Sequence, residues 1–392
     1  MIINRKQLIA LFICSLVTWS IGYGLIPLLP IYAEQLGANA AISGYYLSFV
    51  YLGITLGAFS AGWISDGFHR RKLPIIVSGL ILSPITLLMG KVDKIWELIL
   101  VTAMLWYLGG LLLALFSILT GLSVGEEERG KIFGILAVTM GLGMSVGGLV
   151  VGWLVNHWGY LTMFTAIATI SLITPMTALF LEEKKDGRSI EENISAKRFP
   201  GLGRNFSLLF TAIILSSIMG FFAMLIRSLV MNDLHFSPLE ISSTTIIAGL
   251  IVMPFPLLMG WLSDRIGRKT FLMIGYVISL LSFVLLAFSR VLWNFWLVFI
   301  GQGIATGTTG VVNALVTDLV QRQSLGRGLA RISSASWIGG MIGFALAGLL
   351  LQYLGLTLTF LIGSCFGLVA IGLLLLIHVK SESVVFQGDI HD

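Results

Sequence analysis

Charged residues are scarce in this sequence of 392 residues. Asp, Glu, Lys and Arg make up 11% of it, against roughly 25% in soluble globular domains. Hydrophobic residues make up 57%, and the mean hydropathy is +0.97. With 24 basic and 19 acidic side chains, the chain cannot cover the surface of a soluble protein of this size. The composition therefore excludes soluble multi-domain proteins and indicates an all-α polytopic membrane protein.

Cysteine and histidine are also rare. Cys14 and Cys365 each lie inside a long apolar segment, which excludes a disulfide scaffold. The five histidines are scattered without the spacing of metal ligands. Because little material remains for a catalytic site, we expect no enzymatic activity, no metal and no cofactor.

Apolar segments dominate the sequence. A helix needs about 20 apolar residues to cross a bilayer, and twelve segments qualify. They lie near residues 8–32, 42–64, 73–90, 98–122, 132–156, 161–181, 206–230, 239–262, 271–289, 295–320, 332–354 and 357–378. The sequence therefore predicts twelve transmembrane helices.

The basic residues predict the orientation of these helices. Of the 24 Lys and Arg residues, all but Lys91, Lys94, Arg227 and Arg290 fall on the side that holds both termini. Cytoplasmic loops are enriched in Lys and Arg, so we expect both termini in the cytoplasm of a multi-pass cell-membrane protein. The net charge of +5 then reflects the cytoplasmic loops and does not indicate nucleic-acid binding.

A polar segment divides the twelve spans into six and six. Residues 182–205 are charged and contain Pro200, Gly201 and Gly203. We therefore expect an N-terminal six-helix bundle over 1–181, a cytoplasmic linker over 182–205, a C-terminal six-helix bundle over 206–379 and a cytoplasmic tail over 380–392.

The two halves repeat each other. GWISDGFHRRK, which begins at Gly62, returns as GWLSDRIGRK from Gly260, 198 residues later. Three glycines of span five return in span eleven at an offset of 196: Gly143, Gly147 and Gly152 correspond to Gly339, Gly343 and Gly348. Two independent motifs at nearly the same offset indicate a duplicated six-helix unit in parallel orientation.

This pattern resembles the major facilitator superfamily over essentially the whole chain. The second loop matches the family signature Gly-x-x-x-Asp-(Arg/Lys)-x-Gly-Arg-(Arg/Lys) at Gly260, Asp264, Arg265, Gly267, Arg268 and Lys269. The first loop keeps Gly62, Asp66, Arg70 and Arg71 but has Gly67 and His69 where a basic residue and a glycine are usual. The resemblance implies two pseudo-symmetric bundles and transport without covalent chemistry.

These loops are candidates for a conformational switch. Asp66 and Arg70, like Asp264 and Arg268, are four residues apart, so they can pair on one helical turn or with a partner helix. The glycines Gly62 and Gly260 would let neighbouring backbone approach. The alternative is that the basic residues only anchor these loops on the cytoplasmic side and that the acidic residues have no special role.

Two further elements resemble the twelve-span drug/proton antiporters of the family. Span one carries Pro27-Leu-Leu-Pro30, and the glycines of span five resemble the antiporter signature, although Gly148 stands where a proline is usual. These features favour the efflux branch. The same glycines, Gly143, Gly147 and Gly152, would also serve close helix packing.

In this family spans 1, 4, 7 and 10 line the central cavity, so polar and aromatic residues there are candidate substrate contacts. In span ten, Gln302, Thr306, Thr309 and Asn313 follow one helical face, which indicates a cavity wall or interhelical hydrogen bonding. The full candidate set is Tyr23, Trp106, Tyr107, Met224, Arg227, Gln302, Thr306 and Asn313. For the aromatic members, ordinary packing is the alternative.

Two charged residues have special positions. Arg227 is the one basic residue inside a predicted span, near its outer end, where it would reach the interface or bind a substrate anion. None of the acidic residues lies in the middle of a span, so Glu34, near the Pro27-Leu-Leu-Pro30 element, is the best candidate for proton coupling. This lack of acids favours neutral or amphiphilic substrates.

The leading hypothesis is a monomeric secondary transporter that works by alternating access and exports small apolar or amphiphilic compounds, with protons as a possible coupling ion. One alternative is a uniporter or importer of a sugar-like or organic-anion solute. A second alternative is a lipid flippase or a non-transporting sensor on the same fold.

Overall fold

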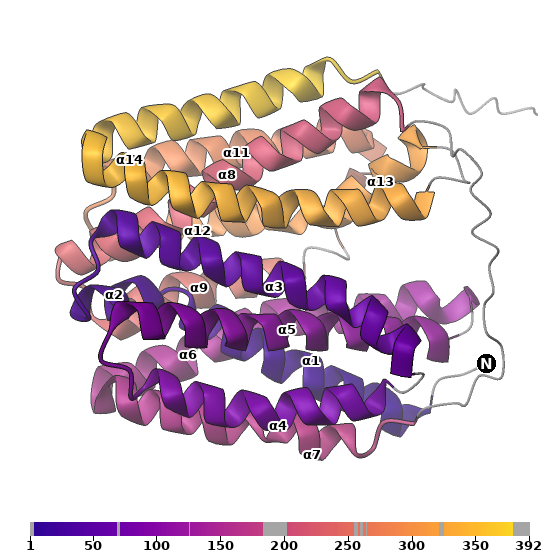
Figure 1. Ribbon diagram of the computed structural model, residues 1–392. Coiled ribbons are helices and arrows are strands. Elements are labelled where there is room, and N and C mark those ends of the chain that lie inside the picture. The colour runs from indigo at the N-terminus through magenta and orange to yellow at the C-terminus, as the bar shows by residue number, and fades with distance from the viewer. Residues whose placement is uncertain are drawn as a thin grey trace, which may run out of the picture.

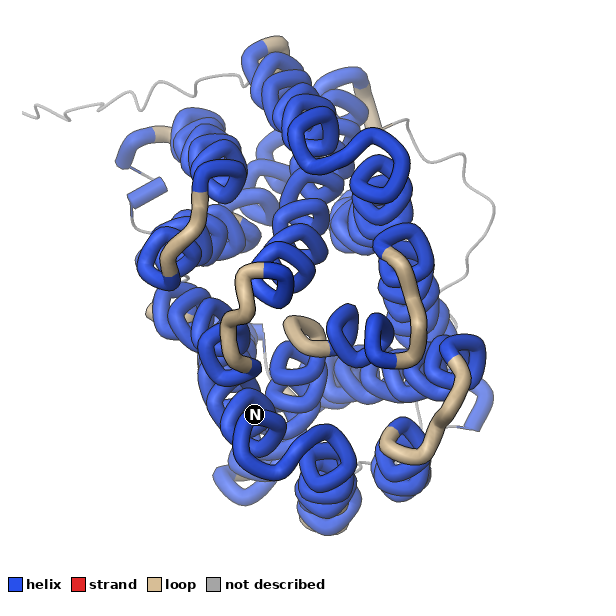
Figure 2. Tube along the Cα trace, turned by 90° about the vertical axis from the view of Figure 1, so that its left-hand side faces the viewer, coloured by secondary structure: helices blue, strands red, loops and turns tan. Residues whose placement is uncertain are grey.

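The computed structural model describes residues 4–68, 71–124, 126–182, 202–254, 258, 262–263, 265–320 and 325–378. These residues are almost wholly helical, and the helices run side by side (Figures 1 and 2). They are α1 (Arg5–Leu25), α2 (Leu29–Gln35), α3 (Ala40–Phe68), α4 (Lys72–Met89), α5 (Ile95–Ser123), α6 (Glu126–Ser171), α7 (Ile173–Ala178), α8 (Arg204–Asp233), α9 (Pro238–Val252), α11 (Arg268–Phe288), α12 (Leu292–Gly307), α13 (Thr309–Leu319) and α14 (Leu325–Leu375).

The helices provide the predicted spans. Among the described residues, nine helical segments are long and apolar enough to cross a membrane. Two of these segments, Gly130–Ala178 and Ser334–Leu375, each contain two antiparallel helices that meet at Gly159 and Gly355. Together with the shorter apolar helix α9, the described part of the chain supplies twelve spans.

The turns at Gly159 and Gly355 repeat the same backbone geometry. Gly159 has φ 76° and ψ 178°, and Gly355 has φ 74° and ψ 177°. A residue with a side chain rarely adopts such a positive φ. The two glycines are 196 residues apart, so the same turn closes helices five and six in one copy and eleven and twelve in the other.

Side-chain contacts repeat as well. Lys72 Nζ donates to the carbonyl of Leu179 at 2.6 Å, and Lys269 Nζ donates to the carbonyls of Leu375 and Ile377 at 2.9 and 2.7 Å. Each lysine thus binds the carbonyl-rich end of the last helix in its copy, where a positive charge is favourable. We call the end that holds these lysines the basic end, and the end with Gly159 and Gly355 the far end.

The prolines of span one interrupt its helix. α1 ends at Leu25 and α2 begins at Leu29, with Pro27 between them and Pro30 in the first turn of α2. Proline has no backbone N–H and fits best in a first turn. The Pro27-Leu-Leu-Pro30 element therefore ends the long helix near the far end and starts a short one.

The two copies meet along two helix pairs. α3 packs against α14, and α6 packs against α9 (Figure 1). Gly44 and Gly348 allow the first pair to approach closely, since a Cβ on Gly348 would lie 2.8 Å from Gly44 Cα. Ser48 Oγ donates to Met341 O at 2.8 Å, and Ser145 Oγ donates to Ile246 O at 3.2 Å.

Large apolar side chains cover the outside of the bundle. Phe288, Phe180 and Met176 are 72%, 67% and 65% exposed. Such a surface is unfavourable in water and fits contact with lipid chains.

Candidate functional site

A cavity of about 290 Å³ lies between α1, α3, α4, α5 and α14. Its wall is mostly aromatic and aliphatic. The larger wall residues are Trp19, Ile21, Tyr23, Ile26, Tyr51, Ile54, Leu82, Leu105, Trp106, Leu113 and Trp337, and among the described residues no charged side chain contributes.

The hydroxyl groups of the two Thr and Ser residues in the wall already donate hydrogen bonds to backbone carbonyls. Thr18 Oγ1 donates to Cys14 O at 2.9 Å, and Ser117 Oγ donates to Leu113 O at 3.0 Å. Both bonds return to the residue's own helix. The wall is therefore weakly polar and suits an uncharged, apolar molecule, which contacts aromatic rings over a large area.

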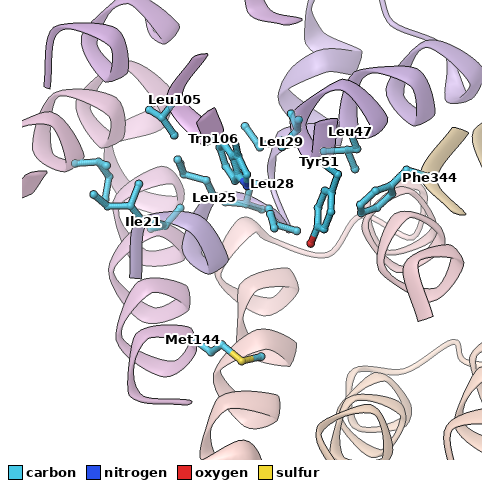
Figure 3. Packing of buried hydrophobic residues seen from close by; sticks show 14 of the residues in the cluster. Ile21, Leu25, Leu28, Leu29, Leu47, Tyr51, Leu105, Trp106, Met144 and Phe344 are labelled. Atoms are coloured by element: carbon cyan, nitrogen blue, oxygen red, sulfur yellow. The ribbon is translucent and has the colours of Figure 1, made fainter. Parts of the chain in front are cut away.

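Aromatic rings close the cavity where the two copies meet. The ring of Tyr51 on α3 lies 4.7 Å from that of Phe221 on α8 and 5.2 Å from that of Phe344 on α14, measured between centroids. Figure 3 shows Tyr51 and Phe344 beside each other. Trp337 of α14 completes the wall from the second copy. The cavity therefore depends on contact between the copies.

The structure places two of the three aromatic candidates in the cavity wall and the third outside it. Tyr23 and Trp106 line the cavity, and Tyr23 stacks on Trp19 at 5.5 Å between ring centroids. Tyr107 lies outside the wall, and its hydroxyl oxygen accepts a hydrogen bond from Ser60 Oγ at 2.9 Å.

Two wall residues, Tyr51 and Trp337, are not among those predicted from the sequence; they come from spans two and eleven. Nothing in their local sequence distinguishes them from other apolar aromatic residues. Only the packing of α3 against α14 brings them to the wall.

The polar face of span ten is divided in the structure. The helix breaks at Thr308 between α12 and α13, so the four residues do not share one continuous helix. Gln302 Nε2 donates to Ser279 O at 3.2 Å, and Ser279 Oγ donates to Gln302 Oε1 at 3.3 Å, which joins α12 to α11. Gln302 thus forms the interhelical bonds of the alternative interpretation. Thr306 and Asn313 are exposed outside the wall of the cavity.

Arg227 does not reach the interface, so that expectation was wrong. Its side chain is 1% exposed, and Nη1 donates to Thr244 Oγ1 at 3.0 Å and Thr245 Oγ1 at 3.2 Å. Its Cζ lies 4.4 Å from the centroid of the Phe299 ring, a cation–π distance. Met224, one turn earlier on α8, is partly buried in the core and lies outside the cavity wall.

Glu34 links the two copies at the far end. Its Oε2 accepts a hydrogen bond of 2.9 Å from Asn232 Nδ2, which joins α2 to α8. Partial burial raises the pKa of Glu34, the nearby charge of Asp233 raises it further, and the bond from Asn232 acts in the opposite direction. Glu34 therefore joins the first copy to the second at the far end.

The glycines of span five serve two interfaces. An added Cβ on Gly143 would meet α1, and one on Gly147 would overlap the carbonyl of Ser20 on the same helix. On the next face of α6, a Cβ on Gly152 would lie 2.6 Å from Ser242 Cβ of α9. These glycines therefore permit close packing within the first copy and between the copies.

A protein-family model matches the chain twice. The model of the Major Facilitator Superfamily covers residues 11–226 and residues 206–389, which together span most of the sequence. The chain belongs to the major facilitator superfamily. It is therefore a multi-pass membrane protein that transports small molecules, and not an enzyme.

Curated superfamily members are similar to this chain. The Multidrug resistance protein MdtG of Klebsiella pneumoniae (strain 342) is 30% identical over 280 residues, which cover 67% of this chain and 66% of that protein. Its namesake from Salmonella choleraesuis (strain SC-B67) is 28% identical over 336 residues, which cover 81% of each.

Solved superfamily structures share the fold. A bacterial homologue of the human lysosomal transporter Spinster, in an inward-facing and unoccupied conformation, has a TM-score of 0.76 at 14% identity and covers 95% of this chain and 97% of its own. A D-xylose-proton symporter has a TM-score of 0.74 at 15% identity, with 96% and 98% covered.

The superfamily loop signature is described only in part. An added Cβ on Gly62 would meet nothing within 4 Å. The side chain of Asp66 and residues Arg70, Gly260 and Asp264 lie outside the described residues. Arg268 Nη1 donates to Asp318 Oδ1 at 2.7 Å and to Ala314 O at 3.0 Å, so this arginine joins α11 to α13 at the basic end.

Proposed function

We propose that this transporter exports lipophilic, largely uncharged compounds. The observation that carries the proposal is the cavity wall, which is rich in aromatic rings and contains no charged side chain among the described residues. A charged molecule would lose its hydration there without compensation. The similarity to proteins named for multidrug resistance supports export as the direction.

A single chain is the working unit in this proposal, with residues 1–181 and 206–379 as its two six-helix halves and 182–205 as the linker. The wall residues come from α1, α3, α4, α5 and α14 of the same molecule. This origin supports a monomer.

The basic end faces the cytoplasm in this proposal, because basic residues concentrate there. The far end is closed by contacts between the halves, namely Glu34 with Asn232, Gly44 with Gly348 and Ser48 with Met341. The structure then corresponds to a state that loads substrate from the cytoplasm or from the inner leaflet. Export requires a second state in which these contacts part.

Protons drive the cycle through Glu34 in this proposal. Burial and Asp233 raise the pKa of Glu34 while the far end is closed. Opening would hydrate the carboxyl group and lower its pKa toward the ordinary value. A proton taken up from the far side therefore favours closure, which is the coupling that an exporter driven by protons needs.

The test measures export of the uncharged dye N-phenyl-1-naphthylamine. Energy-depleted cells that lack their own exporters are loaded with the dye and then energised. Wild-type protein should accelerate loss of the dye, and Trp106→Leu should slow that loss about 2- to 10-fold because an aromatic contact is removed. Trp96→Leu is the matched control, since Trp96 lies on the same helix, is 55% exposed and is no part of the wall.

Equal dye loss with and without the protein would refute export. Equal loss from wild type and Trp106→Leu would refute the assignment of the cavity. Export that persists after the pH gradient has been collapsed would refute proton coupling.

A further inference from the structure

Of the fully buried side chains that the structure describes, that of Arg227 is the largest, and it carries a charge. It lies inside the second half, enclosed by α8, α9 and α12. Its polar partners are the neutral hydroxyl groups of Thr244 and Thr245. Within the described part of the chain, no carboxylate forms a salt bridge with it.

The guanidinium group is also incompletely bonded. Its Nε and Nη2 atoms are buried and have no hydrogen-bond partner. Guanidinium presents its donors in a planar fork that matches carboxylate, sulfonate or phosphate oxygens. A buried charge without a counter-ion is costly, and two free donors beside that charge are what an anion requires.

We propose that Arg227 binds the anionic group of transported amphiphiles, such as a sulfonate or carboxylate attached to an aromatic body. This inference rests on the proposed export function and extends its substrates beyond uncharged compounds. The aromatic body would occupy the cavity, and Arg227 would determine whether an acidic group is accepted.

The position of Arg227 fits this role. Tyr51 of the cavity wall touches Phe221 of α8, and Arg227 lies six residues further toward the far end, about 9 Å along the helix. Asn232, which contacts Glu34 of the other half, follows five residues later. α8 contacts the first half through α2, and α9 contacts it through α6, so two of the helices that enclose Arg227 lie where the halves meet.

The test compares two dyes with the same anilinonaphthalene skeleton. 1-Anilinonaphthalene-8-sulfonate carries the anion, and N-phenyl-1-naphthylamine lacks it. Binding to purified protein in lipid nanodiscs is followed by energy transfer from tryptophan, with empty nanodiscs subtracted. Arg227→Gln should weaken binding of the sulfonate about 10- to 100-fold, the size expected for hydrogen bonds to a charged group, and leave binding of the neutral dye unchanged.

Arg290→Gln is the matched control, because it removes one exposed positive charge at the same end and should leave both affinities unchanged. If Arg227→Gln does not fold, Arg227→Lys is measured instead, since it keeps the positive charge but lacks the planar arrangement of donors that guanidinium provides. A selective loss of sulfonate affinity of at least about threefold supports the proposal.

Sulfonate binding that Arg227 substitutions leave unchanged would overturn the proposal, as would equal losses for both dyes. These results differ from failure of the proposed function, in which the wild-type protein would not export the neutral dye at all.

Discussion

Replacing Gly348 by alanine should weaken the closed far end. The new Cβ would lie 2.5 Å from Ala40 O and 2.8 Å from Gly44 Cα, where ordinary contacts are 3.4–4 Å. Both neighbours are backbone atoms that cannot rotate away. Overpacking of this kind costs about 1–3 kcal/mol, and a state with parted halves does not incur it. The balance should therefore move about 5- to 150-fold toward the open far end.

The assay is a distance measurement between spin labels by pulsed electron paramagnetic resonance. Cysteines at Gln35 and Tyr353, both exposed near the far end, carry the labels. Cys365, which is exposed, is first changed to serine, while Cys14 is buried. Gly348→Ala should increase the population with the longer distance relative to the same labelled protein with Gly348.

Gly372→Ala provides the control, because Gly372 lies in the second helix of α14, after the turn at Gly355, and an added Cβ there would meet nothing within 4 Å. This variant should leave the distance distribution unchanged. A distribution that Gly348→Ala does not alter, or that both alanines alter equally, would refute the argument that close approach at Gly348 closes the far end.

Two further substitutions test the charged groups. Glu34→Gln should hold the far end closed at every pH, whereas in the wild type the closed population should fall as pH rises through the raised pKa of Glu34. The same spin-label distance is recorded from about pH 5 to about pH 8. A wild-type distance distribution that does not change with pH would contradict this prediction. Asp318→Asn removes the 2.7 Å pair with Arg268, which is about one-third exposed and contributes at most about 1 kcal/mol. Dye export should slow up to about fivefold while dye affinity stays constant, and unchanged turnover would count against a switching role.

Much of the fold is predictable from the sequence because membrane physics acts locally. Each span is an apolar segment of sufficient length, and the duplicated glycines indicate the repeat directly. Gly159 and Gly355 show how far this repeat extends, since even their backbone angles agree. The break at Pro27 follows from the missing backbone N–H.

The site is less predictable because it depends on how the helices face each other. Tyr23 and Trp106 were found through the spans that line the cavity in the superfamily, whereas Trp337 reaches the wall only through contact between the halves. The spacing of Gln302 and Asn313 predicts one face of a continuous helix, but the break at Thr308 ends that helix.

Arg227 shows a different limit of sequence reasoning. Its place near the end of a span suggests that it extends to the interface, yet Thr244, Thr245 and Phe299 hold it inside. These partners come from α9 and α12, and their proximity to Arg227 is a tertiary feature that no local pattern encodes.

Locking the far end tests alternating access most directly. Ser48 and Met341 touch across the halves, so cysteines at both positions, in the Cys365→Ser background, would be joined by oxidation or by a short thiol cross-linker. In proteoliposomes, transport of N-phenyl-1-naphthylamine should stop when the cross-link is complete and return when it is reduced. Undiminished transport by fully cross-linked protein would contradict the account.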